Sequence, residues 1–180
     1  CIRDKFDACH IIGSSLIKLD LGKKSLLYTG DYKLESSSLH DGADLDMDSP
    51  NYMLIESTYG DRDHKSRDEV EKEFIDSIKL ALEEGSTIII PAFAVGRSQE
   101  IIEILSKYKI NDVPIFLDGM GQKVSKTYLR YPGFIKDSYK LKKALENVYF
   151  VTNQQERKKA TQKQSIIVTT AGMLEGGPVP

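Results

Sequence analysis

The chain has 180 residues and a formal net charge of −2, and charged side chains make up 29% of it. This balance excludes a uniformly basic surface, and the length suits one domain or one domain with part of a second. No apolar run is long enough to span a membrane and no signal peptide is visible, so we expect a cytoplasmic protein without a membrane partner. Two cysteines are too few for a disulfide framework, and we expect both to be free thiols. The chain begins without methionine and ends after a glycine-rich turn, which we interpret as a piece of a longer polypeptide.

Residues 15–31 predict a β-hairpin. Two runs of alternating polar and apolar residues flank Gly22 and Lys23. A two-residue loop with glycine in the first position favours a type II′ turn. In that register Ile17 lies opposite Tyr28, and the apolar side chains share one face.

Extending the hairpin places a histidine and an aspartate at one edge of the sheet. In the same register Asp31 lies opposite Ser14, and His10 comes four residues earlier, beyond Gly13. Imidazole and carboxylate are both ligands that zinc prefers. From the residues alone, a hydrogen-bonded or exposed histidine and an aspartate that serves in a turn explain this pair better than a metal site does.

A short buried strand is predicted over residues 52–55, after a polar loop over residues 34–50. Glu56 follows the strand, in a position where acids are uncommon unless they are paired. Either a functional acid or a carboxylate bonded to the neighbouring backbone fits this pattern. His40 and His64 lie in polar loops, where we expect both to be solvated.

From residue 67 the chain alternates between helices and strands. Helices are expected over residues 67–84, 95–109, 122–131, 138–147 and 153–162. Strands are expected over residues 86–94, 113–118, 148–152 and 165–170. This order predicts a parallel, doubly wound α/β sheet, and the continuous apolar run in the first of these strands predicts cover on both faces.

Two glycine-containing loops follow strands of this sheet. One contains Arg97 and Ser98 at the start of a helix, and the other contains Thr170, Gly172 and Met173. Ligands of open α/β sheets bind beyond the carboxyl ends of the strands, and a helix N-terminus beside an arginine suits an anion. A plain strand-to-helix turn with a surface arginine is the alternative. Neither loop matches a dinucleotide or P-loop pattern, so we expect no nucleotide cofactor.

Several motifs together resemble those of a known family. They are "DACHIIGSS", "YTGDY", "IESTYGDRDH", "IIIPAFAVGRSQEI", "PIFLDGM" and "IIVTTAGMLEGGPV". In this order they resemble metallo-β-lactamase-fold nucleases of the β-CASP branch. The resemblance is greatest to archaeal relatives of the endonuclease subunit of the cleavage and polyadenylation specificity factor, and RNase J is more distant. It implies part of a metallo-β-lactamase β-sheet domain over residues 1–60 and a parallel, doubly wound β-CASP domain over residues 61–180, incomplete at its C-terminal end.

The resemblance also implies roles for individual residues. His10 would ligate zinc, Asp31 would bridge two zinc ions, and Glu56 would orient the catalytic acid. The RNA or phosphate contacts would come from Arg97, Ser98, Thr170, Gly172 and Met173. The family's "HxHxDH" zinc motif is absent from these residues, so the remaining ligands are expected outside this chain. Cys9 stands where glycine is common in the family.

The function implied for the intact protein is zinc-dependent hydrolysis of RNA phosphodiester bonds, in RNA processing or degradation. We expect these 180 residues alone to be inactive. RNA is the expected partner, with either a homo-oligomer or an RNA-processing complex around it. The alternatives are a DNA-processing nuclease of the same superfamily and a non-catalytic RNA-binding subunit.

Overall fold

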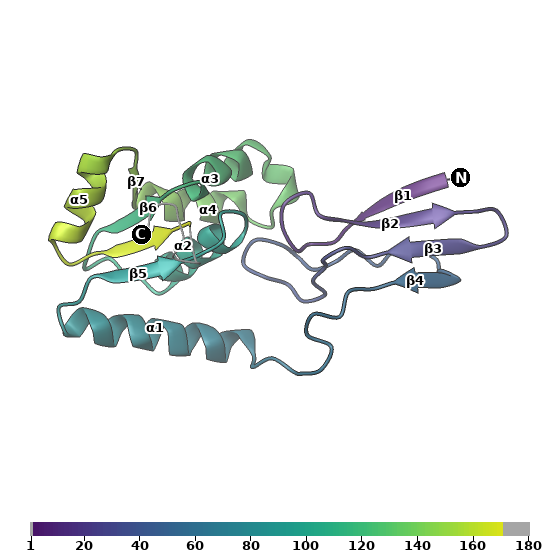
Figure 1. Cartoon of the computed structure of the whole chain (residues 1–180), viewed down its shortest axis with the longest axis horizontal. Coiled ribbons are helices and arrows are strands. Elements are labelled where there is room, and N and C mark those ends of the chain that lie inside the picture. The colour runs from purple at the N-terminus through teal and green to yellow at the C-terminus, as the bar shows by residue number, and fades with distance from the viewer. Residues whose placement is uncertain (1, 171–180) are drawn as a thin grey trace. The chain divides into compact units, whose positions relative to one another are not determined.

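The computed structural model describes residues 2–170, and the chain divides into two compact units. The first unit consists of Cys1–Asp63 with Gly133–Lys136, and the second of His64–Pro132 with Asp137–Pro180. The predicted α/β class is confirmed, since the second unit is a parallel sheet with helices packed on it (Figure 1). In the described part of the chain, no helix is both long and apolar enough to cross a membrane.

The first unit is built on a four-stranded sheet in the order β1-β2-β3-β4. Its strands are β1 (Ile2–Asp7), β2 (Ser15–Asp20), β3 (Ser25–Tyr28) and β4 (Tyr52–Leu54). Strand β2 pairs antiparallel with β1 and with β3, whereas β3 and β4 pair parallel. Figure 1 shows the four strands side by side.

The β2–β3 hairpin has the predicted register. Ile17 lies opposite Tyr28, and the chain reverses at Gly22, whose φ is +89°. Lys23 has no positive φ, so glycine alone occupies the left-handed region, as a type II′ turn requires. The Leu21 amide donates to the Lys24 carbonyl across the loop at 2.8 Å.

Strand β4 exists, but the prediction that it is buried is wrong. All three of its residues are exposed, and so is Ile55 after it. The strand pairs with β3 on one side only and forms the edge of this sheet in the described residues. The apolar run therefore predicted the strand correctly, but it did not indicate whether the strand lies at the edge or in the centre of the sheet.

The core of the first unit lies under the loop that follows β3. Ala8, Leu16 and Leu27 are buried together. Phe6, Tyr32, Ala43 and Met47 pack against them. The loop is fastened to the end of β1, because the amides of Lys33 and Asp44 donate to the carbonyls of Ala8 and Asp7 at 2.9 and 2.8 Å.

His40 in this loop is buried, so the prediction that it is solvated is wrong. Its side chain is only 5% exposed, and its carbonyl accepts a hydrogen bond of 2.8 Å from the Ser37 amide. The Ser37 hydroxyl in turn accepts from the His40 amide at 3.0 Å. This tight local turn folds the histidine inward although the loop sequence is polar. His64 is exposed, as predicted.

The second unit is a parallel sheet in the order β5-β8-β6-β7. Its strands are β5 (Ile88–Pro91), β6 (Ile115–Asp118), β7 (Val148–Val151) and β8 (Ile166–Thr169). Its helices are α1 (Arg67–Glu83), α2 (Arg97–Lys107), α3 (Gly121–Arg130), α4 (Ser138–Glu146) and α5 (Gln154–Gln162). A short 3₁₀ helix, Pro132–Phe134, precedes α4.

Strand position decides burial in this sheet. All four residues of the central strand β8 are buried, as its apolar run suggests. The edge strand β5 is also rich in isoleucine but leaves Ile89 exposed, so the prediction of cover on both faces is wrong for β5. Helices α2, α3 and α4 contact one another, while α1 packs along β5 and α5 contacts β7 (Figure 1).

Candidate functional site

The loop between β1 and β2 holds His10 in a turn closed by Ser14. The Ser14 hydroxyl accepts from the His10 amide at 3.1 Å and from the Ile11 amide at 3.3 Å, and it donates to the Ile11 carbonyl at 2.8 Å. Gly13 has a φ of +84°, which lets the chain turn back into β2. The glycine and serine after the histidine therefore shape the loop, and the imidazole is left exposed.

Cys9 lies on the buried side of this loop. Its φ of +52° is in the left-handed region, which explains why glycine suits the position. Burial raises the pKa of the thiol, and the nearby Asp7 carboxylate raises it further. The thiol is free and buried whereas His10 is exposed, so the two neighbours face different surroundings.

Asp31 lies beside the same loop. Gly30 precedes it with a φ of +53°, and a Cβ added to Gly30 would lie 3.9 Å from the Ser15 carbonyl oxygen. The Lys33–Ala8 hydrogen bond brings the two chain segments together on the other side of Asp31. Asp31 and His10 therefore lie at the same edge of the first sheet, as the hairpin predicts.

Both side chains are open to solvent. In the described part of the chain, neither the His10 imidazole nor the Asp31 carboxylate makes a side-chain hydrogen bond or an ion pair. An exposed histidine is also what the alternative interpretation predicts. The exposure leaves both side chains accessible to an external ligand.

Glu56 reaches this edge from the end of β4. Its amide donates to the Thr29 hydroxyl at 3.3 Å, and its carboxylate accepts from the Thr58 amide at 2.8 Å. The hydrogen bonds from Thr58 lower the pKa of Glu56, and the charge of nearby His10 lowers it slightly more. Glu56 is thus a carboxylate bonded to its own backbone that also lies within electrostatic reach of His10.

The donor set at this edge fits part of a zinc site. An imidazole and a carboxylate suit zinc, but a catalytic zinc ion takes three protein ligands. Among residues 2–170, no group of three or more His, Cys, Asp or Glu side chains converges closely enough to hold a metal ion. The chain therefore offers two donors on one edge and would need further ligands from elsewhere.

The predicted phosphate contacts belong to the second unit, at the carboxyl edge of its sheet. Arg97 opens α2 and is half-exposed, and its Nη1 forms an ion pair of 2.6 Å with Glu100. Ser98 is fully buried, and its hydroxyl donates to the Phe93 carbonyl at 2.8 Å. In this conformation Ser98 fixes the loop after β5 and does not reach solvent.

Thr170 connects two neighbouring strand ends. Its hydroxyl accepts from the Met120 amide at 2.8 Å, and its own amide donates to the Asp118 carbonyl at 3.3 Å. Gly172 and Met173 lie outside the described residues.

A comparison with domain families identifies this part of the chain. Residues 98–180 match the Beta-Casp domain. This part of the chain is similar to β-CASP domains. The predicted resemblance to β-CASP ribonucleases is thereby confirmed.

Three relatives support the same assignment. The chain is 46% identical to "Probable RNase MJ4" of Methanocaldococcus jannaschii, with 97% of this chain and 42% of the relative aligned. It is 35% identical to "RNase aCSPSF2" of Saccharolobus solfataricus, over 96% of this chain and 35% of the relative. It is 34% identical to "Transcription termination factor FttA" of Thermococcus kodakarensis, over 96% of this chain and 29% of the relative. The chain thus spans less than half the length of each of these relatives.

One ion pair in the β-CASP domain was not predicted. Asp118 is buried at the end of β6, and Arg157 of α5 binds it through two bonds, Nε–Oδ2 at 2.6 Å and Nη2–Oδ1 at 2.9 Å. The Asp118 carboxylate also accepts from the Gly119 amide at 2.8 Å. The acid at the end of the "PIFLD" strand was a visible signal, but nothing in the sequence indicated its partner 39 residues later.

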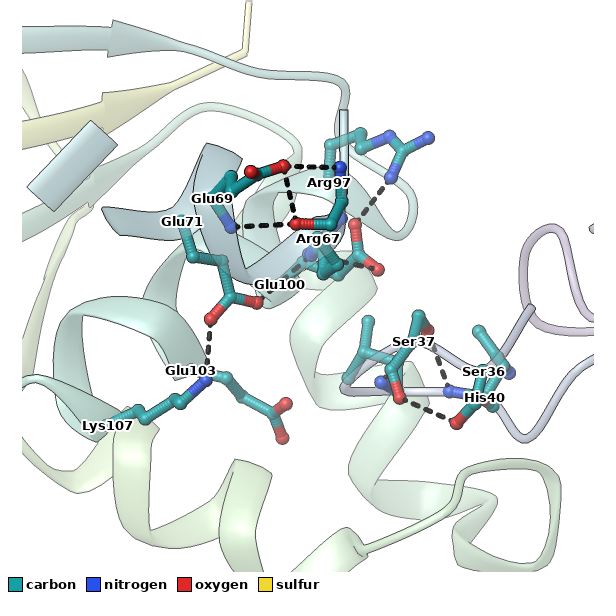
Figure 2. Close-up of polar contacts among 12 residues, drawn as sticks. Ser36, Ser37, His40, Arg67, Glu69, Glu71, Arg97, Glu100, Glu103 and Lys107 are labelled. Atoms are coloured by element: carbon teal, nitrogen blue, oxygen red, sulfur yellow. Dashed lines mark hydrogen bonds and ion pairs between the residues drawn. The ribbon is translucent and has the colours of Figure 1, made fainter. Parts of the chain in front are cut away.

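A second network joins α1 to α2 (Figure 2). The buried carboxylate of Glu71 accepts from Arg67 Nε at 3.0 Å and from Lys107 Nζ at 2.7 Å. Glu100 pairs with Arg97 and, at 3.8 Å, with Arg67. Burial raises the pKa of Glu71, but the hydrogen bonds from Lys107 and Arg67 outweigh burial and hold the pKa below its usual value. This network ties the two helices together, and Arg97 is the one residue that it shares with the predicted phosphate contacts.

Proposed function

We propose that the intact protein is a zinc-dependent ribonuclease that hydrolyses RNA phosphodiester bonds in RNA processing or degradation. The observation that carries the proposal is the pair His10 and Asp31, both exposed at one edge of the first sheet, with no hydrogen bond or ion pair from either side chain among the described residues. Two of the relatives are named as RNases, and a third as a transcription termination factor, so RNA is the substrate that this proposal favours. The free, buried Cys9 suits a reducing, cytoplasmic location.

Each residue at this edge has a distinct role in the proposal. His10 would ligate one zinc ion, and Asp31 would bridge two, with the remaining ligands supplied from outside these 180 residues. Two bound zinc ions supply an activated water and stabilise charge that develops on the phosphate. The Glu56 carboxylate, whose pKa is lowered, is ionised at neutral pH and can hold a protonated histidine in place by accepting a hydrogen bond.

The β-CASP domain would hold the RNA backbone. Arg97 is half-exposed and can bind a phosphate bidentately, in competition with its bond to Glu100. Thr170 lies at the same carboxyl edge of the sheet, and Gly172 and Met173 are proposed to extend the contact. Ser98 is better assigned to fixing the loop that precedes Arg97, because its hydroxyl is already bonded to the Phe93 carbonyl. Contacts of this kind position the substrate without reading its sequence.

The test uses the intact protein with Asp31→Ala. Removing the proposed bridging carboxylate should abolish RNA cleavage and lower the zinc content measured by elemental analysis. Asp46→Ala is a matched control, because Asp46 is an exposed acid in the same unit. Full cleavage by Asp31→Ala would contradict the mechanism.

Two further measurements separate the alternatives. Parallel assays with RNA and with single-stranded DNA of the same sequence distinguish a ribonuclease from a DNA-processing nuclease. Binding of RNA without any cleavage in the presence of zinc would indicate the non-catalytic RNA-binding subunit.

A further inference from the structure

Two large apolar side chains stand in solvent at the carboxyl edge of the β-CASP sheet. Phe93 follows β5 and is 77% exposed, and Met120 follows β6 and is 67% exposed. Among the described residues, no other large hydrophobic side chain is as exposed as Phe93. Neither is buried in the core, so both side chains are accessible to a ligand at this edge of the sheet.

The backbone that presents Phe93 is held firmly. Its carbonyl accepts from the Ser98 amide at 3.1 Å and from the Ser98 hydroxyl at 2.8 Å. The preceding residue, Ala92, donates to the Thr169 carbonyl of β8 at 2.9 Å. The backbone of Phe93 is therefore held in place while its aromatic ring is exposed. Because the backbone is already ordered, little conformational entropy is lost when a flat ligand stacks on the ring.

The same residues join the Phe93 loop to the Met120 loop. The Ser98 hydroxyl lies 3.2 Å from the position that a Gly121 Cβ would take. Gln99, next to Ser98, donates through Nε2 to the Gly121 carbonyl at 3.2 Å. Phe93 and Met120 thus lie at the ends of β5 and β6, which flank β8, on loops whose following helices touch at their first residues. We refer to this pair as the stacking platform.

Positive charge borders the stacking platform. Lys123 is exposed in the first turn of α3, three residues after Met120, and within residues 2–170 no carboxylate pairs with its ammonium group. Arg97 lies in the first turn of α2, four residues after Phe93. An aromatic ring with a flexible apolar neighbour and flanking cations suits a single-stranded nucleic acid, which offers bases to stack and phosphates to pair.

We propose that the stacking platform binds an unpaired base of single-stranded RNA, with the base on the Phe93 ring, Met120 at its edge and Lys123 on the adjacent phosphate. This inference rests on the proposed ribonuclease function and adds residues of the second unit that bind the substrate. Stacking tolerates any base, so the platform gives affinity for single strands and little sequence preference.

The experiment compares variants of the intact protein on a short single-stranded RNA. Phe93→Ala should raise KM about tenfold with kcat nearly unchanged, since stacking on one aromatic side chain contributes affinity of this order. Phe93→Tyr should retain the wild-type KM. Tyr149→Ala removes an exposed aromatic ring from the second residue of β7, toward the opposite edge of the sheet, and should leave KM unchanged.

A spectroscopic measurement tests stacking directly. All proteins in this measurement carry Asp31→Ala, and the RNA carries 2-aminopurine at one position at a time. The protein with Phe93 and its Phe93→Tyr variant should quench the 2-aminopurine fluorescence at one of these positions. The Phe93→Ala variant should not quench it at any position. If Phe93→Ala leaves KM and quenching unchanged while the wild type cleaves RNA, the inference fails and the proposed function stands. If Phe93→Ala lowers the melting temperature by several degrees without changing KM, a protein segment covers the ring and the inference is again wrong. If the wild type neither cleaves nor binds RNA, the proposed function itself fails.

Discussion

Cys9 occupies a backbone conformation that disfavours every side chain with a Cβ. Its φ of +52° costs an L-residue about 1–2 kcal/mol relative to a right-handed conformation, and glycine avoids most of this cost. The buried thiol offsets part of it through its contacts. The position is therefore balanced between backbone strain and side-chain packing.

This balance gives a prediction for two substitutions. Cys9→Gly should change the free energy of unfolding by less than about 1 kcal/mol, because relief of strain and loss of packing nearly cancel. Cys9→Val should destabilise by about 2 kcal/mol or more, since a β-branched side chain fits the left-handed region poorly. Urea unfolding of the three proteins provides the comparison, and a Val variant as stable as the Gly variant would contradict the assigned backbone conformation.

His10 and Asp31 could be placed together at one edge of the first sheet from the local sequence pattern alone. Gly22 fixed the turn and the turn fixed the register, so Asp31 and His10 could be placed at one edge without further information. Their chemical roles came only from the resemblance. The buried state of Ser98 was not predictable, because the sequence does not show that its hydroxyl turns inward to Phe93.

At the scale of elements, the helices were predicted well and the exposure of strands was not. Helices α1 to α4 have a periodic apolar face, and α1 has a definite end at Gly85; these signals are local. Helix α5 has a single apolar residue, Ala160. Strand β1 went unpredicted because charged residues interrupt its apolar ones. Exposure of β4 and β5 depends on their place at a sheet edge, which is set by pairing between distant segments.

The ion network between α1 and α2 makes the packing of α1 sensitive to acid. Because the folded pKa of Glu71 is lowered, its contribution to stability is complete above the unfolded value of about 4.3 and is lost as the pH falls toward the folded value. Removing the charge of Glu71 should therefore lower the free energy of unfolding at neutral pH and have a much smaller effect in acid.

The corresponding variant is Glu71→Gln. At pH 7 it should lower the free energy of unfolding by about 1–2 kcal/mol, since two hydrogen bonds to a buried carboxylate are weakened. The difference from wild type should shrink as the pH is lowered from about 5 to about 3. Glu73→Gln is the control on the same helix, because its pair with Lys65 is well exposed and should contribute less than about 1 kcal/mol. A pH-independent loss in Glu71→Gln would show that packing and not charge is responsible.

At the scale of the whole molecule, the chain combines a part that is similar to β-CASP domains with a sheet edge that carries two possible metal ligands. The described residues bring His10 and Asp31 to one edge, yet no third ligand converges with them. A catalytic zinc ion with two protein ligands is undercoordinated and weakly held. The relatives are more than twice as long as the aligned region, which leaves room for the missing ligands in proteins of their length.

These 180 residues alone should therefore bind zinc weakly and cleave no RNA. The intact protein should bind zinc tightly and cleave RNA. The measurement is cleavage of a labelled single-stranded RNA with added zinc, together with zinc stoichiometry after dialysis. The isolated chain should still bind RNA through its β-CASP domain, and Phe93→Ala should weaken that binding while Asp31→Ala should not. Zinc-dependent cleavage by the isolated chain, abolished by Asp31→Ala, would mean that residues 1–180 contain a complete metal site and that the two-donor edge is only part of it.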